Sequence, residues 1–163
     1  MIIDFLDWKF DVDVERTMAR SALEAAEHCT CAYCRNFYET VDEGNPELRY
    51  FLAEFGVDIE APDVLYPYDI DEEMCYEGEY VVLGRILKQG SGPIHVCGAC
   101  ILPTALSTHS VEQPHFILSF YELELPWVLD EPLDDVVSTA NEPSFQEQMW
   151  QRLLPRLEET TEQ

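Results

Sequence analysis

The chain has 163 residues, and its 33 acidic residues against 9 basic ones give a formal net charge of −24. Nucleic acids and anionic membranes are held by clustered Lys and Arg, so this composition excludes both as direct partners. A hydrophobic content of 47% excludes the disordered class, whose members have too little apolar surface to bury. We therefore expect one acidic domain over residues 1–163, with a basic protein or a cation as its partner.

The sequence also predicts a compartment. It begins Met1-Ile2-Ile3-Asp4, which lacks the basic segment and apolar run of a secretory signal. No apolar run reaches the length that spans a membrane. We expect a cytoplasmic protein, in which cysteines serve as free thiols or metal ligands before they form disulfides.

The first third of the chain predicts one strand and three helices. Residues 2–10 alternate in polarity as a half-buried strand does, with Leu6, Trp8 and Phe10 on one face. Asp13 caps a helix over residues 14–27, which has a weak apolar stripe of Val14, Met18, Ala22 and Ala25. A short helix follows, with Tyr33, Phe37 and Val41 on one side. Asn45-Pro46 opens the third helix and Gly56 ends it, after apolar positions at Leu48, Phe51, Leu52 and Phe55.

Strands dominate the middle of the chain. Residues 57–78 are rich in Pro, Asp, Glu and Tyr and predict a loop with one short strand at most. Residues 80–87 predict a strand, residues 90–93 a turn and residues 103–114 an irregular segment. Residues 115–125 are apolar on both faces over most of their length, which favours a central strand.

A capping box at Ser144 and Glu147 predicts a last helix, reaching about residue 157. Helices at both ends with strands between them, and no regular βαβ alternation, indicate the α+β class. We expect a single domain with a mainly antiparallel sheet and flanking helices, which a zinc ion could staple.

Six cysteines carry the clearest chemical signal. Cys29-Thr30-Cys31-Ala32-Tyr33-Cys34 is followed far along the chain by a second C-x-x-C motif, Cys97-Gly98-Ala99-Cys100. Zinc favours four thiolate or imidazole ligands, commonly from two such knuckles. We predict a structural zinc held by Cys31, Cys34, Cys97 and Cys100, with Cys29, His28 or His95 as substitutes. Unligated thiols and redox use remain the alternatives, although neither motif opens a helix after a strand in a βαβ setting.

The sequence also resembles a family. Cys29 to Phe37 (C-T-C-A-Y-C-R-N-F), Leu125 to Pro132 (L-P-W-V-L-D-E-P) and Asp4-Phe5 resemble an uncharacterised family of small acidic proteins encoded by gut Firmicutes, often on mobile elements. The Cys97–Cys100 pair is not part of this resemblance. The family implies no mechanism, but a mobile-element setting would favour a counter-defence or immunity role.

Two acidic segments are candidate partner-binding sites. One comprises Asp69, Asp71, Glu72 and Glu73, for which a solvated loop is the alternative. The other places Trp127 before Asp130, Glu131, Asp134 and Asp135. Aromatic anchors ringed by charge are typical of interface centres, although a Trp that caps the core would look the same in the sequence.

From these features we predict a non-enzymatic inhibitor. Its carboxylates would imitate the phosphates of nucleic acid and block a basic DNA- or RNA-handling protein, as an anti-CRISPR-like counter-defence protein would. A toxin-immunity protein would use the same physics. The alternatives are a zinc-stabilised adaptor, whose acidity serves solubility, and a metal-dependent enzyme that uses its carboxylates.

Overall fold

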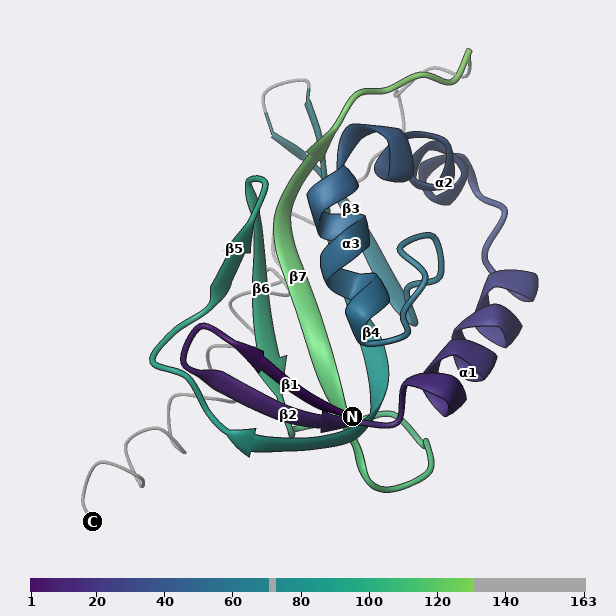
Figure 1. Cartoon of the computed structure of the whole chain (residues 1–163). Coiled ribbons are helices and arrows are strands. Elements are labelled where there is room, and N and C mark those ends of the chain that lie inside the picture. Colours follow the sequence, from purple (N-terminus) through teal and green to yellow (C-terminus); the bar gives the residue numbers. More distant parts are fainter. Residues whose placement is uncertain (71–72, 131–163) are drawn as a thin grey trace.

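A seven-stranded sheet with three helices forms the body of the protein in the computed structural model, which describes residues 1–70 and 73–130 (Figure 1). All strand pairs are antiparallel, and the predicted α+β class is confirmed. The helices are α1 (Val14–Ala26), α2 (Ala32–Gly44) and α3 (Pro46–Glu54). The strands are β1 (Ile2–Phe5), β2 (Trp8–Val12), β3 (Val64–Ile70), β4 (Glu73–Lys88), β5 (Ile94–Val96), β6 (Ala99–Thr104) and β7 (His115–Leu125).

The strand order is β1-β2-β4-β7-β6-β5, with β3 paired to β4 off this path. β7 lies between β4 and β6, which confirms the predicted central strand. β4 has 16 residues and pairs with β3 near its beginning and with β2 near its end. This long strand therefore joins the hairpin at the N-terminus to the rest of the sheet.

An aromatic core lies between the sheet and the helices. α2 and α3 cover one face of the sheet, in front of β4 and β7 in the view of Figure 1. Phe37 of α2 stacks on Phe120 of β7 with centroids 6.1 Å apart, and Phe10 stacks on Phe116 at 5.4 Å. Burying a Phe side chain contributes about 1.5–3 kcal/mol, so this layer fixes α2 against the sheet.

The predicted helix boundaries agree with local signals in the structure. The Asp13 carboxylate accepts a hydrogen bond from the Arg16 backbone N–H at 3.2 Å, so the N-cap of α1 is confirmed. Pro46 opens α3, and Gly56 follows its end with a φ of +82°. A Cβ at Gly56 would lie 2.5 Å from the Val14 carbonyl oxygen, so the same glycine allows α1 to approach α3.

Two hairpins differ from the sequence prediction. Residues 2–10 form no single strand: the chain turns at Leu6, which has a φ of +53° and is 78% exposed, while Trp8 and Phe10 are buried. The alternation of polarity continues through this turn, so the sequence pattern does not reveal where the chain reverses. Residues 57–78, predicted as a loop with at most one short strand, contain β3 and also the start of β4. β3 tolerates Pro67 because it pairs with β4 alone.

The apolar stripe predicted for α1 is also wrong. The buried residues of this helix are Thr17 and Ser21, whereas Met18 is 58% exposed. The helix predicted from Ser144 lies outside the described residues. None of the helices that the structure describes has the length and apolarity to cross a membrane.

Candidate metal centre

Three cysteines converge where α2 begins. The sulfur atoms of Cys29, Cys31 and Cys34 lie within 4.8 Å of one another. Cys29 belongs to the connection between α1 and α2, Cys31 is the N-cap of α2, and Cys34 stands in the first turn. The C-x-C-x-x-C segment therefore forms a cluster that could hold a metal ion.

The start of the helix brings these side chains together. Cys31 has an extended backbone, with φ −64° and ψ 161°, and the helix begins at the next residue. Its N–H donates a hydrogen bond to the Cys29 sulfur at 3.5 Å, which folds the connection back onto the helix end. Arg35 supports this turn, since its Nε donates to the Thr30 carbonyl oxygen at 2.9 Å. Cys31 and Cys34, three positions apart, then share one side of the first turn.

The three thiols differ in their surroundings. Cys29 and Cys31 are exposed and Cys34 is buried. Hydrogen bonds from the backbone and side chain of Cys31 lower the pKa of the Cys29 thiol, which favours its thiolate. Burial raises the pKa of Cys34, and the neighbouring Cys31 and Cys29 add to this shift. The N-terminus of a helix also favours negative charge, so the cluster suits a cation that replaces the thiol protons.

Tyr38 lies close to the cysteine cluster. Burial raises the pKa of its hydroxyl, and the nearby Cys34 and Cys29 add to the shift. The Tyr38 ring stacks on the His28 ring, with centroids 4.0 Å apart. Such partners orient metal ligands, and Tyr38 was missed in the sequence although it follows Cys34 at the helical spacing of four residues.

The second C-x-x-C pair does not join this cluster. Cys97 and Gly98, with φ values of +46° and +81°, form the turn of the β5–β6 hairpin, and the Cys97 thiol donates to a Glu47 carboxylate oxygen at 2.7 Å. Cys100 is buried beside Leu102 and Tyr121. The predicted site of Cys31, Cys34, Cys97 and Cys100 is therefore corrected: within residues 1–70 and 73–130, Cys29 takes a place beside Cys31 and Cys34, and the second pair belongs to a hairpin.

The predicted partner-binding residues are only partly described. Trp127 is half-buried against the core, with its ring 5.8 Å from that of Tyr33, and Asp130 is exposed. Asp69 and Glu73 lie at the paired ends of β3 and β4. The other predicted acids lie outside the described residues: Asp71, Glu72, Glu131, Asp134 and Asp135.

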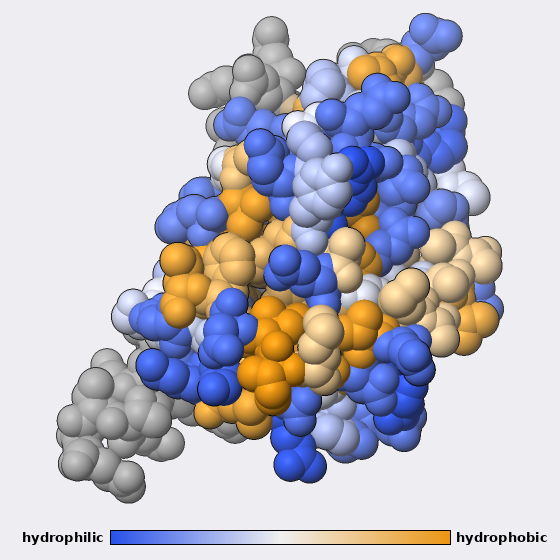
Figure 2. All heavy atoms as spheres, viewed as in Figure 1, coloured by the Kyte–Doolittle hydropathy of each residue, from blue (hydrophilic) through white to orange (hydrophobic). Residues whose placement is uncertain are grey.

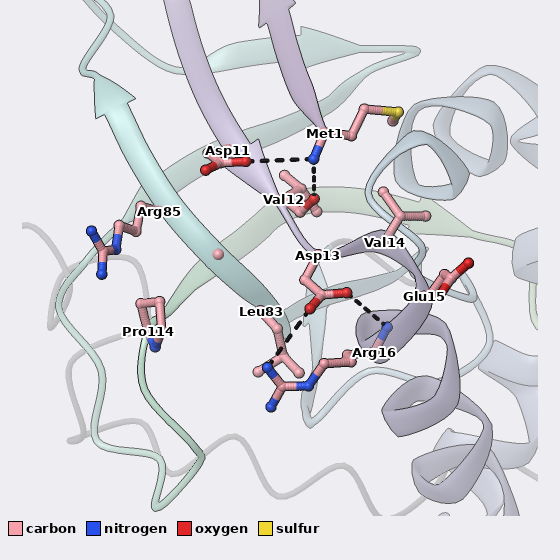
Figure 3. A pocket seen from close by; sticks show the side chains of 11 residues that line it. Met1, Asp11, Val12, Asp13, Val14, Glu15, Arg16, Leu83, Arg85 and Pro114 are labelled. Atoms are coloured by element: carbon pink, nitrogen blue, oxygen red, sulfur yellow. Dashed lines mark hydrogen bonds and ion pairs between the residues drawn. The ribbon is translucent and has the colours of Figure 1, made fainter.

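A hollow of about 590 Å³ lies at the other end of the molecule, where the N-terminus meets the start of α1 (Figure 3). The Met1 ammonium group donates to the Val12 carbonyl oxygen at 2.7 Å and lies 3.4 Å from the Asp11 carboxylate. Arg16 forms ion pairs with Asp13 and Glu112. The charges of the hollow are largely matched within the chain, so we assign no ligand to it.

Comparisons with protein-family models, curated proteins and solved structures find no match. The cysteine cluster is therefore interpreted from its own geometry.

Proposed function

We propose that the protein is a non-enzymatic zinc-binding protein and that Cys29, Cys31 and Cys34 are the ligands. The proposal rests on the convergence of the three sulfur atoms at the start of α2. Thiolates select soft or borderline ions such as Zn²⁺, whereas Ca²⁺ and Mg²⁺ prefer oxygen. Three thiolates supply most of the tetrahedral set, and a water molecule or a partner side chain completes it.

The role that fits this location is structural. Residues 27–31, between α1 and α2, belong to neither helix, and α2 is packed on the aromatic core through Phe37 and Val41. A zinc ion would tie this exposed connection to a helix end that is already fixed. The cysteine cluster would then order the corner between α1 and α2.

Metal content measured on matched variants tests the proposal. Protein purified without chelator should carry one zinc per chain, and Cys31→Ser or Cys34→Ser should lose most of it. Cys97→Ser is the control, because this thiol lies on the β5–β6 turn and contacts Glu47. Equal zinc in Cys31→Ser and wild-type protein, or no zinc in any of them, would reject the site.

A second candidate function follows from the surface charge. Glu39 and Glu43 of α2 and Glu47 of α3 are exposed acids. The basic Arg49 of α3 forms an ion pair with Asp42 of α2. Hydrophilic side chains cover much of this part of the molecule in Figure 2. We propose that this surface binds a basic nucleic-acid-handling protein by imitating phosphates, as a counter-defence or immunity protein would.

A pulldown from host lysate at about 50 mM salt and then at higher salt tests this second function, because ion-pair binding weakens as salt rises. A basic nucleic-acid enzyme should be retained at low salt and displaced by added DNA. Glu39→Lys with Glu43→Lys should abolish retention, and Glu112→Lys, on the β6–β7 connection, should not. Retention that survives high salt and DNA would contradict imitation.

A further inference from the structure

Helix α1 buries no continuous apolar stripe, although Val14 at its start packs partly against the core. Its buried positions are the polar Thr17 and Ser21, while Met18 is 58% and Leu23 70% exposed. A surface helix normally turns its apolar side to the core and its polar side to water. Met18 is therefore available at the surface of the helix, and Leu23 is exposed on another side of it.

Polar bonds explain why the helix keeps this orientation. The Thr17 hydroxyl donates to the Asp13 carbonyl oxygen at 2.7 Å and accepts from the Leu83 N–H at 3.1 Å. The Ser21 hydroxyl accepts from the Asp58 N–H at 2.9 Å. Arg20 also forms an ion pair with Asp63. Rotating α1 to bury Met18 would break these bonds, so the Met18 side chain stays at the surface.

Met18 borders a groove of about 290 Å³. Met18 and Ala22 of α1 form one wall, and Ala53 of α3 with Val57 forms the other. Gly56 lies between them, and a Cβ there would lie 3.2 Å from the Met18 side chain. Figure 2 shows apolar side chains over the C-terminal end of α3 and over α1. We call these lining residues the α1–α3 groove.

One residue that lines the α1–α3 groove is acidic, and two further acids are near its lining residues in the sequence. Asp58 lines the groove, Glu54 follows Ala53, and Glu15 stands one turn before Met18; all three are exposed. The basic residues of the same helices are engaged elsewhere: Arg16 with Asp13 and Glu112, Arg20 with Asp63 and Glu24, and Arg49 with Asp42. A second copy would bring the same acids and a charge of −24, so charge complementarity points to a basic partner.

We propose that the α1–α3 groove binds an amphipathic basic helix of a partner protein. Apolar residues of that helix would enter between Met18 and Ala53, and flanking Lys or Arg would face Glu15, Glu54 and Asp58. This is the helix-in-groove mode of recognition, in which a flexible Met adapts to the apolar anchor. The groove uses neither the zinc ligands nor the acids of α2, so it goes beyond both functions proposed above.

Fluorescence anisotropy with designed peptides tests the proposal. The probe is a labelled helix of about 18 residues in which Leu and Ala repeat at i, i+3, i+4 and i+7 and Lys and Arg fill the other face. One control replaces Lys and Arg with Glu, and another keeps the composition but carries two prolines. The basic helix should bind, and both controls should bind at least about tenfold more weakly.

Variants on one helix locate the binding surface. Met18→Glu should weaken binding by about tenfold or more, because it places a charge in the groove. Leu23→Glu is the matched control: it lies on the same helix, is exposed and does not line the groove, so binding should change less than twofold. Circular dichroism should show that both variants remain folded, since Glu is a good helix former.

Several outcomes would overturn the proposal. Equal binding of the acidic or proline-containing peptide would refute the charge or the helical shape of the ligand. Equal loss in Met18→Glu and Leu23→Glu would refute the groove. Self-association of the chain that disappears in Met18→Glu would assign the groove to a second copy. Running the assay with and without chelator separates this proposal from the zinc site, because the expected binding does not depend on metal.

Discussion

Asn36 is a fully buried amide that fixes the chain beyond β7. Its Nδ2 donates to the Tyr76 hydroxyl at 3.2 Å and to the Pro126 carbonyl oxygen at 3.0 Å, and its Oδ1 accepts from the Val128 N–H at 2.9 Å. Tyr76 in turn donates to the Tyr33 carbonyl oxygen at 2.8 Å. The network joins α2, next to the cysteine cluster, to the sheet.

Asn36→Ala should lower the free energy of unfolding by about 2–4 kcal/mol, because several buried polar groups would lose their partner together. Urea denaturation measures this loss. Asn45→Ala is the comparison, since within residues 1–70 and 73–130 the Asn45 side chain makes one hydrogen bond, to the Val41 carbonyl oxygen. A change within about 0.5 kcal/mol for Asn36→Ala would show that the network contributes nothing to stability.

The raised pKa of a buried tyrosine makes the free energy of unfolding depend on pH in the alkaline range. Burial raises the pKa of Tyr76 to about 12 from its ordinary 10.0, so its neutral form is favoured in the folded protein. Above about pH 10 the unfolded chain loses this proton while the folded chain keeps it, and stability falls as pH rises. The free energy of unfolding, measured from pH 9 to 12, should decline less steeply in Tyr76→Phe. An equal slope in both proteins would contradict the assignment to Tyr76.

At the scale of elements, Gly84 is a position of β4 that lies close to the backbone of β2. Its φ is +146°, and a Cβ there would lie 2.1 Å from the Asp11 carbonyl oxygen. Gly84→Ala should therefore destabilise the protein by about 3 kcal/mol, through overpacking and backbone strain. Thermal unfolding measures the effect.

Gly92→Ala is the matched control for Gly84, because nothing lies within 4 Å of a Cβ at that position. Its midpoint of thermal unfolding should stay close to that of the wild type. If Gly84→Ala were equally stable, the described approach of β2 to β4 would be wrong.

Elements with local signals could be predicted from the sequence. Asp13, Pro46 and Gly56 mark the helix ends chemically, and the double apolar face of β7 reveals its central place. The turn at Leu6 and the burial of Thr17 depend on which segments pair and pack. The periodicity of apolar residues carries no information on which segments pair and pack. For this reason it predicted the wrong buried side of α1.

At the scale of the molecule, the sequence correctly predicted that Cys31 and Cys34 belong to one candidate metal site, but it wrongly added Cys97 and Cys100. Cys31 and Cys34 lie on one helical turn, so their spacing is enough to bring them together. The same C-x-x-C spacing arises at Cys97 and Cys100 from a two-residue hairpin turn, which separates the two side chains. The sequence motif cannot distinguish a metal knuckle from a hairpin. The structure places Cys31 and Cys34 in a cluster that could hold a metal ion, and Cys97 and Cys100 at a hairpin turn.

X-ray absorption of the zinc-loaded protein tests the central claim most directly, because it counts the sulfur atoms around the metal. We expect three Zn–S distances of about 2.3 Å and one shorter bond to nitrogen or oxygen, as Cys29, Cys31 and Cys34 require. Cys97→Ser should leave this spectrum unchanged. Four sulfur ligands, falling to three in Cys97→Ser, would contradict the three-cysteine centre and restore a site that joins the two motifs.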